Sequence, residues 1–251
     1  KEYVLSTKLS GAAGNMLWRY YYFFGNTCSE GANSIAETTD GNLSVVGYVK
    51  RCTTGLTGPY DMFYTQLTAA GITVPGTYNK FLWTGTLNLW GDKITRYTNI
   101  AGSDNLVISG YVDIKRPTTV NRQILITNIK QSGALISMQH IGDTLSDVAN
   151  DLIVEPVAGT ASYNMFVTGA TSNYNSTSAV KSEAYYMSLK LSAATGVTGV
   201  TEFSTFPVTA VPYNTYTGRS GLEIKNASFY KRFAILATGN YKPTAASTQT
   251  Y

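Results

Sequence analysis

Apolar and polar residues alternate with a period of two along short segments of this chain, and turns rich in glycine separate the segments. In one such unit, residues 34–39, 43–49, 62–67 and 78–83 predict four consecutive strands, and Asp40-Gly41 between the first two is a hairpin signal. Nothing longer than a turn has the spacing of an amphipathic helix. The pattern therefore predicts an all-β chain.

Two sequence markers repeat along the chain. An apolar residue before a Gly-ended turn stands at Leu9, Leu67, Ile129 and Leu191, with spacings of 58, 62 and 62 residues. A glycine near the end of a strand stands at Gly47, Gly110, Gly169 and Gly239, with spacings of 63, 59 and 70 residues. Two markers that keep nearly the same period indicate an internal repeat, which decides the architecture before any other signal.

Four short antiparallel strands in a repeat of about 60 residues form the blade of a β-propeller. We therefore expect residues 1–251 to form a single propeller domain of four four-stranded blades. Three blades cover approximately residues 33–90, 91–150 and 151–206, and the fourth combines residues 220–240 with residues 1–23. In that fourth blade, Tyr3–Leu9 is expected to pair with Phe233–Gly239, which closes the ring and leaves no open edge. The alternatives are that the chain is a piece of a larger propeller, or that neighbouring molecules in an assembly make this pairing.

Part of the chain resembles a known kind of repeat. The resemblance lies in Trp18 with the following YYYFFGNTCSEGANSIAETTDGNLSVVGY, and in DMFYTQLTAAG from Asp61. Together these segments resemble the secreted propeller-type repeats of surface proteins in Bacteroidetes-like bacteria. The resemblance implies a propeller outside the cell or at its surface, and it does not specify an activity. The second and fourth repeats depart from the pattern because they lack Asp-Gly, and the chain shows no C-terminal sorting domain of that kind.

Composition and charge narrow the cellular setting. Only 14% of residues are charged, against roughly a quarter in an average soluble protein. The net charge is +4 and no run of Lys and Arg exceeds two residues, so we expect no nucleic-acid partner. No apolar run approaches the roughly 18 residues that a membrane span requires. The start at Lys1 is what a secreted chain would show after removal of its signal peptide.

The two cysteines are predicted to form a disulfide. Cys28 lies just before the first strand of the first full blade and Cys52 just after the second. A hairpin that turns near Gly41 places Cys52 opposite residue 31, and a short loop can bring Cys28 within bridging distance. The bridge would imply an oxidising compartment; two unpaired buried thiols are the alternative. Possible glycosylation sites are the sequons at Asn42, Asn175 and Asn226.

Catalytic and metal chemistry find little support in the sequence. His140 is the only histidine and there are two thiols, so no zinc site of the usual kind can be built. Asp143, Asp147 and Asp151 are spaced by four and could share one face of a helical turn with Ca²⁺. Asp147 aligns with Glu30 in the repeat, however, which favours a role in bonding loop backbone. We expect no cofactor, no metal, no catalytic residue and no enzyme activity, with a glycosidase as the less favoured alternative.

Long connections are expected at one end of the blades. They join second to third strands, and fourth to first strands, and such loops on a rigid scaffold usually carry binding residues. The candidates for ligand or partner binding there are Tyr60, Trp83, Trp90, Arg116, Tyr174, Tyr213, Tyr216 and Arg219. The alternative is that these rings pack the loops onto the blades.

The sequence thus favours a non-enzymatic extracellular or cell-surface propeller that binds a protein or glycan through its long-loop end. The alternative is a structural subunit of a surface filament, layer or secretion-associated assembly. A binding module should behave as a monomer in solution, whereas a structural subunit should self-associate or join a larger assembly.

Overall fold

The computed structural model describes most of the chain. The described residues are 4–11, 13–23, 29–51, 59–82, 86–99, 101–115, 120–142, 146–157, 160–172, 182–206, 215–225, 231–244 and 247–250. Side-chain surroundings are described as far as residue 201, except at residues 86, 87, 172 and 182–184.

Every regular element in these ranges is a strand, and every pairing is antiparallel. Sheet one contains β3 (Glu30–Glu37), β4 (Leu43–Lys50), β5 (Tyr60–Leu67) and β6 (Asn79–Phe81). Sheet two contains β7 (Thr86–Thr98), β8 (Asp104–Lys115), β9 (Val120–Lys130) and β10 (Leu135–Ile141). Sheet three contains β11 (Asp147–Pro156), β12 (Ser162–Ser172), β13 (Ser182–Ser192) and β14 (Gly196–Phe206).

Two smaller sheets flank these three. Sheet four contains β15 (Thr215–Lys225), β16 (Lys231–Thr244) and β17 (Ser247–Thr250), and a separate hairpin contains β1 (Val4–Leu9) and β2 (Met16–Tyr22). The all-β prediction and the four-strand repeat are confirmed for sheets one to three. Strand β17 was not expected from the sequence, and β6 is shorter than the predicted fourth strand.

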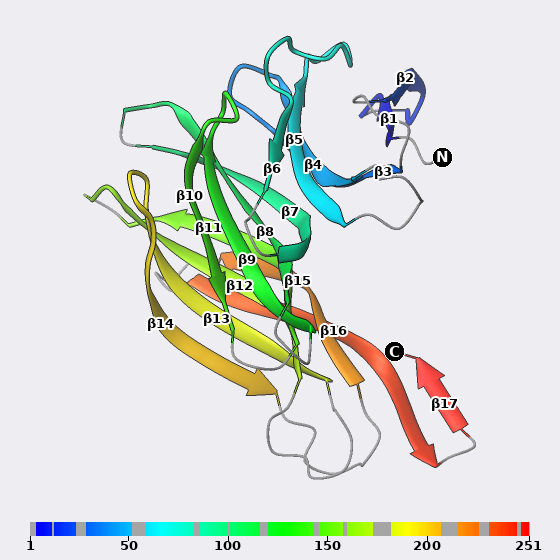
Figure 1. The fold of residues 1–251 in the computed structure, drawn as a ribbon, viewed down its shortest axis with the longest axis vertical. Coiled ribbons are helices and arrows are strands. Elements are labelled where there is room, and N and C mark those ends of the chain that lie inside the picture. The colour runs from blue at the N-terminus through cyan, green and yellow to red at the C-terminus, as the bar shows by residue number, and fades with distance from the viewer. Residues whose placement is uncertain are drawn as a thin grey trace.

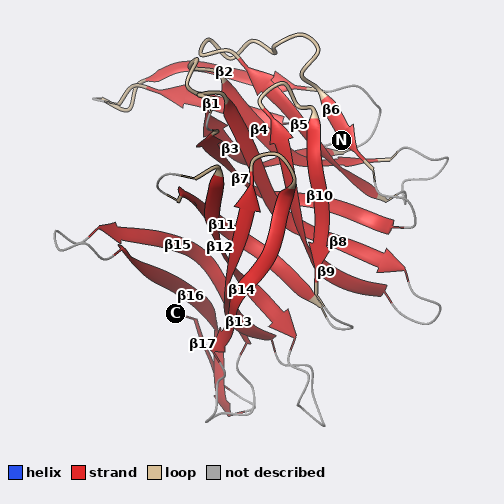
Figure 2. Cartoon of the chain, turned by 90° about the vertical axis from the view of Figure 1, so that its left-hand side faces the viewer, coloured by secondary structure: helices blue, strands red, loops and turns tan. Residues whose placement is uncertain are grey.

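The sheets stack face to face in chain order and form an arc (Figure 1; Figure 2). The first strands β3, β7, β11 and β15 each contact the next one, whereas the fourth strands lie further apart. Sheets that converge on their first strands in this way form a fan, as blades of a propeller do. The hairpin lies at one end of the arc, and sheet four lies at the other (Figure 1).

Apolar residues on both faces of the sheets hold the stack together. Along β8, Leu106 and Ile108 pack in the cluster between sheets one and two, while Val107 packs in the cluster between sheets two and three. All three side chains are fully buried. Alternation with a period of two therefore supplies both faces of one strand with core residues.

A β-bulge in the first strand explains the glycine marker of the repeat. The bulged residues are Asn33, Asp92, Asn150 and Arg219. In sheets one to three the residue paired just before the bulge faces Gly47, Gly110 or Gly169 of the second strand. A Cβ at any of these glycines would lie 1.9 Å from a first-strand carbonyl oxygen. Only glycine allows this close approach of two backbones.

Sheet four departs from this rule. Its bulge pairs Gly218 with Ala237, so the glycine stands on the first strand instead of the second. The expected marker Gly239 pairs with Tyr216, beyond the bulge. The repeat is thus preserved in geometry, although its glycine has changed strands.

The predicted ring closure is not formed in this structure. Within the described residues, β1 pairs with β2 alone, and β16 pairs with β15 and β17. The physical reason is that the hairpin packs on sheet one, at the opposite end of the arc from β16. Val4 and Tyr22 are buried there against Val45, Phe63 and Leu67.

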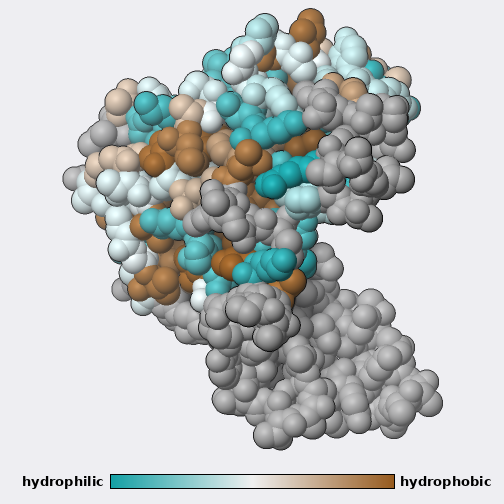
Figure 3. All heavy atoms as spheres, in the orientation of Figure 1, coloured by the Kyte–Doolittle hydropathy of each residue, from teal (hydrophilic) through white to brown (hydrophobic). Residues whose placement is uncertain are grey.

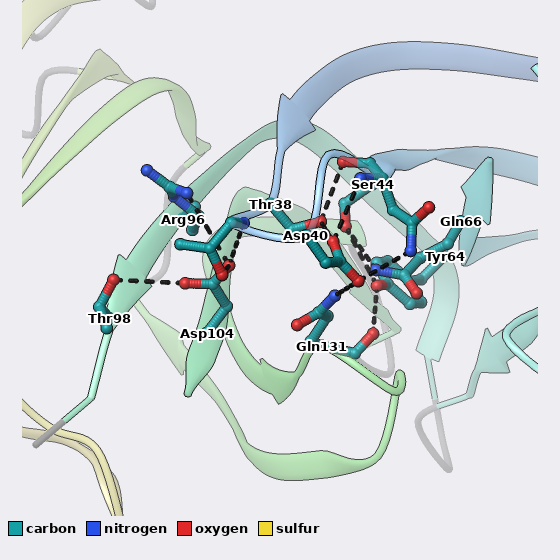
Figure 4. A network of polar contacts seen from close by, with 11 residues as sticks. Thr38, Asp40, Ser44, Tyr64, Gln66, Arg96, Thr98, Asp104 and Gln131 are labelled. Carbon is teal, nitrogen blue, oxygen red and sulfur yellow. Dashed lines mark hydrogen bonds and ion pairs between the residues drawn. The ribbon is translucent and has the colours of Figure 1, made fainter. Parts of the chain in front are cut away.

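Polar contacts join the turn between β3 and β4 of sheet one to sheet two (Figure 4). The buried carboxylate of Asp104 accepts hydrogen bonds from the backbone N–H of Thr39 at 2.6 Å and from its hydroxyl at 2.9 Å. Gln131 of the turn after β9 donates to Asp40 at 2.7 Å, and its backbone oxygen accepts a hydrogen bond from the Tyr64 hydroxyl. A buried charge such as that of Asp104 needs such partners. These contacts therefore stabilise the packing of sheet one on sheet two at this end.

We expect Gly110→Ala to destabilise the chain strongly. The new Cβ would meet the Trp90 carbonyl oxygen at 1.9 Å, and neither backbone can move without breaking the pairing beside the bulge. Such overpacking typically costs about 1–3 kcal/mol and sometimes more. Urea unfolding measures the change. The control is Gly199→Ala in β14, where a Cβ meets nothing within 4 Å; equal effects of the two substitutions would refute the role assigned to the bulge.

Candidate functional site

The connections that the sequence predicts to be long leave from one end of the stacked sheets, but the prediction of their length is only partly right. Residues 51–59, 173–181 and 207–214 form long connections at this end, whereas residues 82–85 and 116–119 form short ones, and the long connection of residues 68–78 lies at the opposite end. Because neighbouring strands are antiparallel, the connections between β4 and β5, β6 and β7, β8 and β9, and β10 and β11 all emerge at the same end. The connections between β12 and β13 and between β14 and β15 do so too. Most of their residues lie outside the described ranges. The described strand ends form the base of what we call the long-loop end.

A continuous stack of rings joins sheets one and two at this base. Tyr48 of β4 stacks on Trp90 of β7 with ring centroids 3.8 Å apart, and Trp90 stacks on Tyr111 of β8 at 5.7 Å. The guanidinium of Arg122 in β9 lies over the ring of Tyr111, 3.8 Å from the ring centroid. The ring of Tyr48 lies over Gly31, where any side chain would collide with it. We call Tyr48, Trp90, Tyr111 and Arg122 the aromatic stack.

Hydrogen bonds hold the cationic end of the aromatic stack in place. Arg122 binds Asp113 through two nitrogens, at 2.7 and 3.1 Å, and Asn88 donates to the same carboxylate at 2.8 Å. Bidentate pairs of this kind fix geometry as well as charge. Burial raises the pKa of Tyr111 to about 12, although the nearby Arg122 opposes that shift.

Tyr60 lies at the rim of the aromatic stack. As the first residue of β5, it meets Tyr48 and Trp90 edge-on at 5.5 and 5.1 Å, and its backbone N–H donates to Asn88. The Lys50 ammonium lies 5.8 Å from the Tyr60 ring centre. Tyr60 is therefore a half-buried aromatic ring with a cation beside it. Among the described residues of the long-loop end, this pair is best suited to contact a ligand.

The structure brings two of the eight predicted binding residues together. Tyr60 and Trp90 are neighbours, but Trp90 lies inside β7 with both faces of its ring covered. Tyr216 and Arg219 lie within β15, not in the connection before it, and their side chains are not described. Trp83, Arg116, Tyr174 and Tyr213 lie outside the described residues. Sequence reasoning missed Tyr48, Tyr111 and Arg122, although the Gly-Tyr pairs at 47–48 and 110–111 were a visible signal.

Carboxylates near this end are engaged by cations. Arg51 pairs with Asp61 at 2.5 Å, and Lys93 pairs with Asp151 at 3.0 Å. Asp147 and Asp151 lie in β11, so the helical turn considered from their spacing is wrong; Thr171 donates to Asp147 instead. His140 lies on β10 and contacts Gln123. Over the described ranges, no three His, Cys, Asp or Glu side chains are grouped to hold a metal ion.

Other predicted sites fall largely beyond the described residues. Cys28 and Cys52 both lie outside them, as do Asn175 and Asn226. Asn42 lies in the turn after β3, where its side-chain amide donates to Asp40 at 2.8 Å. On the face seen in Figure 3, apolar and polar residues are interspersed.

Comparisons with known proteins add no family. No protein-family model matches this chain, and no curated protein is recognisably similar to it in sequence. Within its described part, the chain has no helix long and apolar enough to cross a membrane.

We expect Trp90→Ala to destabilise the fold. The indole is enclosed between Tyr48 and Tyr111, so truncation leaves a gap across the interface of sheets one and two. The cost should be about 2–3 kcal/mol, somewhat below the value for a fully buried aromatic residue because Trp90 is only half-buried. Thermal unfolding measures it. An unchanged melting temperature would instead favour a ring held for ligand contact.

Alkaline conditions should weaken the fold through Tyr111. In the unfolded chain the Tyr111 hydroxyl loses its proton near the ordinary pKa of 10.0, whereas in the folded chain burial raises this pKa to about 12. The free energy of unfolding therefore falls as pH rises through this window, and the contribution is fully present below it. Denaturation series across the window should show a smaller fall for Tyr111→Phe. The control is Tyr21→Phe, at a residue 69% exposed, whose free energy of unfolding should fall with pH as that of the parent does. If the free energies of the parent and both variants fall equally, Tyr111 is not the source of the pH dependence.

Proposed function

We propose that this chain is a non-enzymatic propeller-type protein that binds a protein or glycan partner through its long-loop end, outside the cell or at its surface. The sheets serve as blades, and a complete fourth blade requires strands of the β1–β2 type beside β15–β16. One observation carries the proposal: the connections of sheets one and two at this end emerge beside a rigid base, the aromatic stack, with Tyr60 and Lys50 at its rim. Loops on such a base are ordered at little entropic cost on binding.

The charges at this end support binding in preference to catalysis. Asp61 and Asp113 each pair with an arginine. A glycosidase needs two carboxyl groups that face one sugar and differ in protonation. Carboxylates committed to arginines stabilise the strand ends instead. Glycan rings and protein side chains can both pack against an aromatic rim, so the two partner classes share one chemistry.

A structural subunit of a surface assembly is the second candidate. The observation that favours it is the outward face of the β1–β2 hairpin, which exposes apolar residues. Leu5 is 52% exposed, Leu17 58% and Tyr21 69%. Exposed apolar groups gathered on one small hairpin are typical of a protein contact.

Tyr60→Ala is the test of binding at the long-loop end. A glycan array and a pull-down of surface proteins with the intact chain first identify the partner. The variant should then bind it at least tenfold more weakly, which corresponds to about 1.4 kcal/mol, because aromatic anchors carry much of the energy of such contacts. Tyr21→Ala, on the hairpin, is the control and should bind as the parent does. Equal affinity for all three proteins would place the partner elsewhere.

A further inference from the structure

The β1–β2 hairpin lies against sheet one as the outer half of another sheet would. In sheets one to three, the turn between third and fourth strands contains a glycine with positive φ: Gly71, Gly133 and Gly196. Side chains from the preceding unit cover each of these turns: Trp18 and Tyr20 at Gly71, Tyr64 and Asn79 at Gly133, and Ser137 at Gly196. The hairpin thus occupies the place of third and fourth strands in a unit before sheet one.

Hydrogen bonds anchor the hairpin in that place. The Trp18 indole donates to the Ala69 backbone oxygen at 3.1 Å, and the Tyr22 hydroxyl donates to the Gly71 oxygen at 2.6 Å. The position is therefore a specific contact between hairpin and sheet.

The inner half of that unit is missing beside the hairpin. In sheets one to three, the third strand pairs with a second strand along one edge and a fourth strand along the other. Strand β1 is the equivalent third strand, and in the described part of the chain it pairs only with β2. Its other edge therefore offers unpaired backbone groups to an incoming strand.

Exposure at one repeated position shows the same gap. Ile94 of β7 and Leu152 of β11 pack against the preceding sheet and are each 2% exposed. Ile35 occupies the same position in β3 and is 49% exposed. The residue just before the bulge shows the same difference in exposure: Ala149 of β11 is 0% exposed, whereas Ala32 of β3 is exposed. Sheet one lacks the inner strands that cover its two neighbours.

A groove runs where those strands are missing. It measures about 280 Å³ and lies between the edge of β1 and the face of β3. Val4, Ser6, Asn33, Ile35, Val45 and Leu67 line it. The groove has an apolar floor and a strand edge along one side, which are the two features that a first-and-second strand pair needs.

We propose that the β15–β16 strand pair of a second copy of this chain docks in the groove, with its β16 beside β1. The pair is of the required type, because it forms the first and second strands of sheet four. Strand β17 pairs with β16 only at Asn240, Tyr241 and Thr244, and the described backbone from Lys231 to Gly239 has no partner on that edge. This stretch includes the apolar run from Phe233 to Ala237.

A second copy fits better than the chain's own strand pair. The chain's own β15 is packed on β11, β12 and β13 at the other end of the arc. Bringing it to the groove would disturb interfaces whose core residues are fully buried, whereas a separate copy leaves them intact. Docking of one end on the opposite end of the next copy is head-to-tail and builds rings or filaments. The association does not depend on the ligand at the long-loop end and would repeat that end along the assembly.

Ile35→Arg tests the proposal by light scattering coupled to size exclusion over a concentration series. The parent should exceed the 27.2 kDa of one chain, with a mass that rises with concentration. The variant should need at least tenfold more protein to reach the same mass, because a charge would be buried in the groove. Leu135→Arg on β10, at a residue 50% exposed, is the matched control and should associate as the parent does.

Two results would overturn the proposal. The first is a parent that stays at the mass of one chain at every concentration; a sharp fall in its melting temperature on Ile35→Arg would then mean that its own strands fill the groove. The second is an Ile35→Arg variant that associates as the parent does. Partner binding measured with Tyr60→Ala is a separate readout, so failure here leaves the proposed function standing.

Discussion

Each large sheet of this chain has two apolar faces, and each face must be covered by another sheet. Sheet two meets the constraint fully, since Leu106 and Val107 are both buried although they point in opposite directions. Sheet one meets it on the side of sheet two and only partly on the other, where the hairpin covers β4 and β5 and leaves Ile35 of β3 half-exposed. Burial of apolar area is the main stabilising contribution here, so sheets arranged in this way tend to continue stacking until both ends are covered.

The bulge beside the glycine sets how closely the inner strands approach. An extra residue at Asn33, Asp92 or Asn150 interrupts the regular pairing of the first strand, and the facing glycine leaves room for a first-strand carbonyl oxygen. Bulges also increase local twist, which lets the first strands converge while the fourth strands spread. The aromatic stack lies immediately beyond this bulge. Trp90 directly precedes Gly91 and Tyr111 directly follows Gly110, so the same local geometry aligns their rings.

Much of the fold could be predicted from the sequence, because period-two patterning and turn glycines are local signals. Strand ends were harder to predict: β8 runs from Asp104 to Lys115 and so includes Asp104 and Asp113, polar residues of a type common in loops. Their carboxylates are satisfied by Thr39 and by Arg122, contacts that connect distant parts of the chain. Gly91-Asp92 likewise has the composition of a turn, yet it is a bulge inside β7, so Trp90 lies in a strand and not in the predicted connection.

The candidate site was less accessible to sequence reasoning for a related reason. Exposed and packed aromatic residues have the same composition, and only the arrangement of neighbouring strands tells them apart. Trp90 has a ring on each face, whereas Tyr60 meets two rings edge-on and has Lys50 beside it. The stack therefore acts through rigidity: it fixes the spacing of β4, β7 and β8 near the strand ends at the long-loop end. Under the proposed function, a partner that bound the connections at this end would meet loops anchored on closely packed strands, which would limit the conformational entropy that binding must overcome.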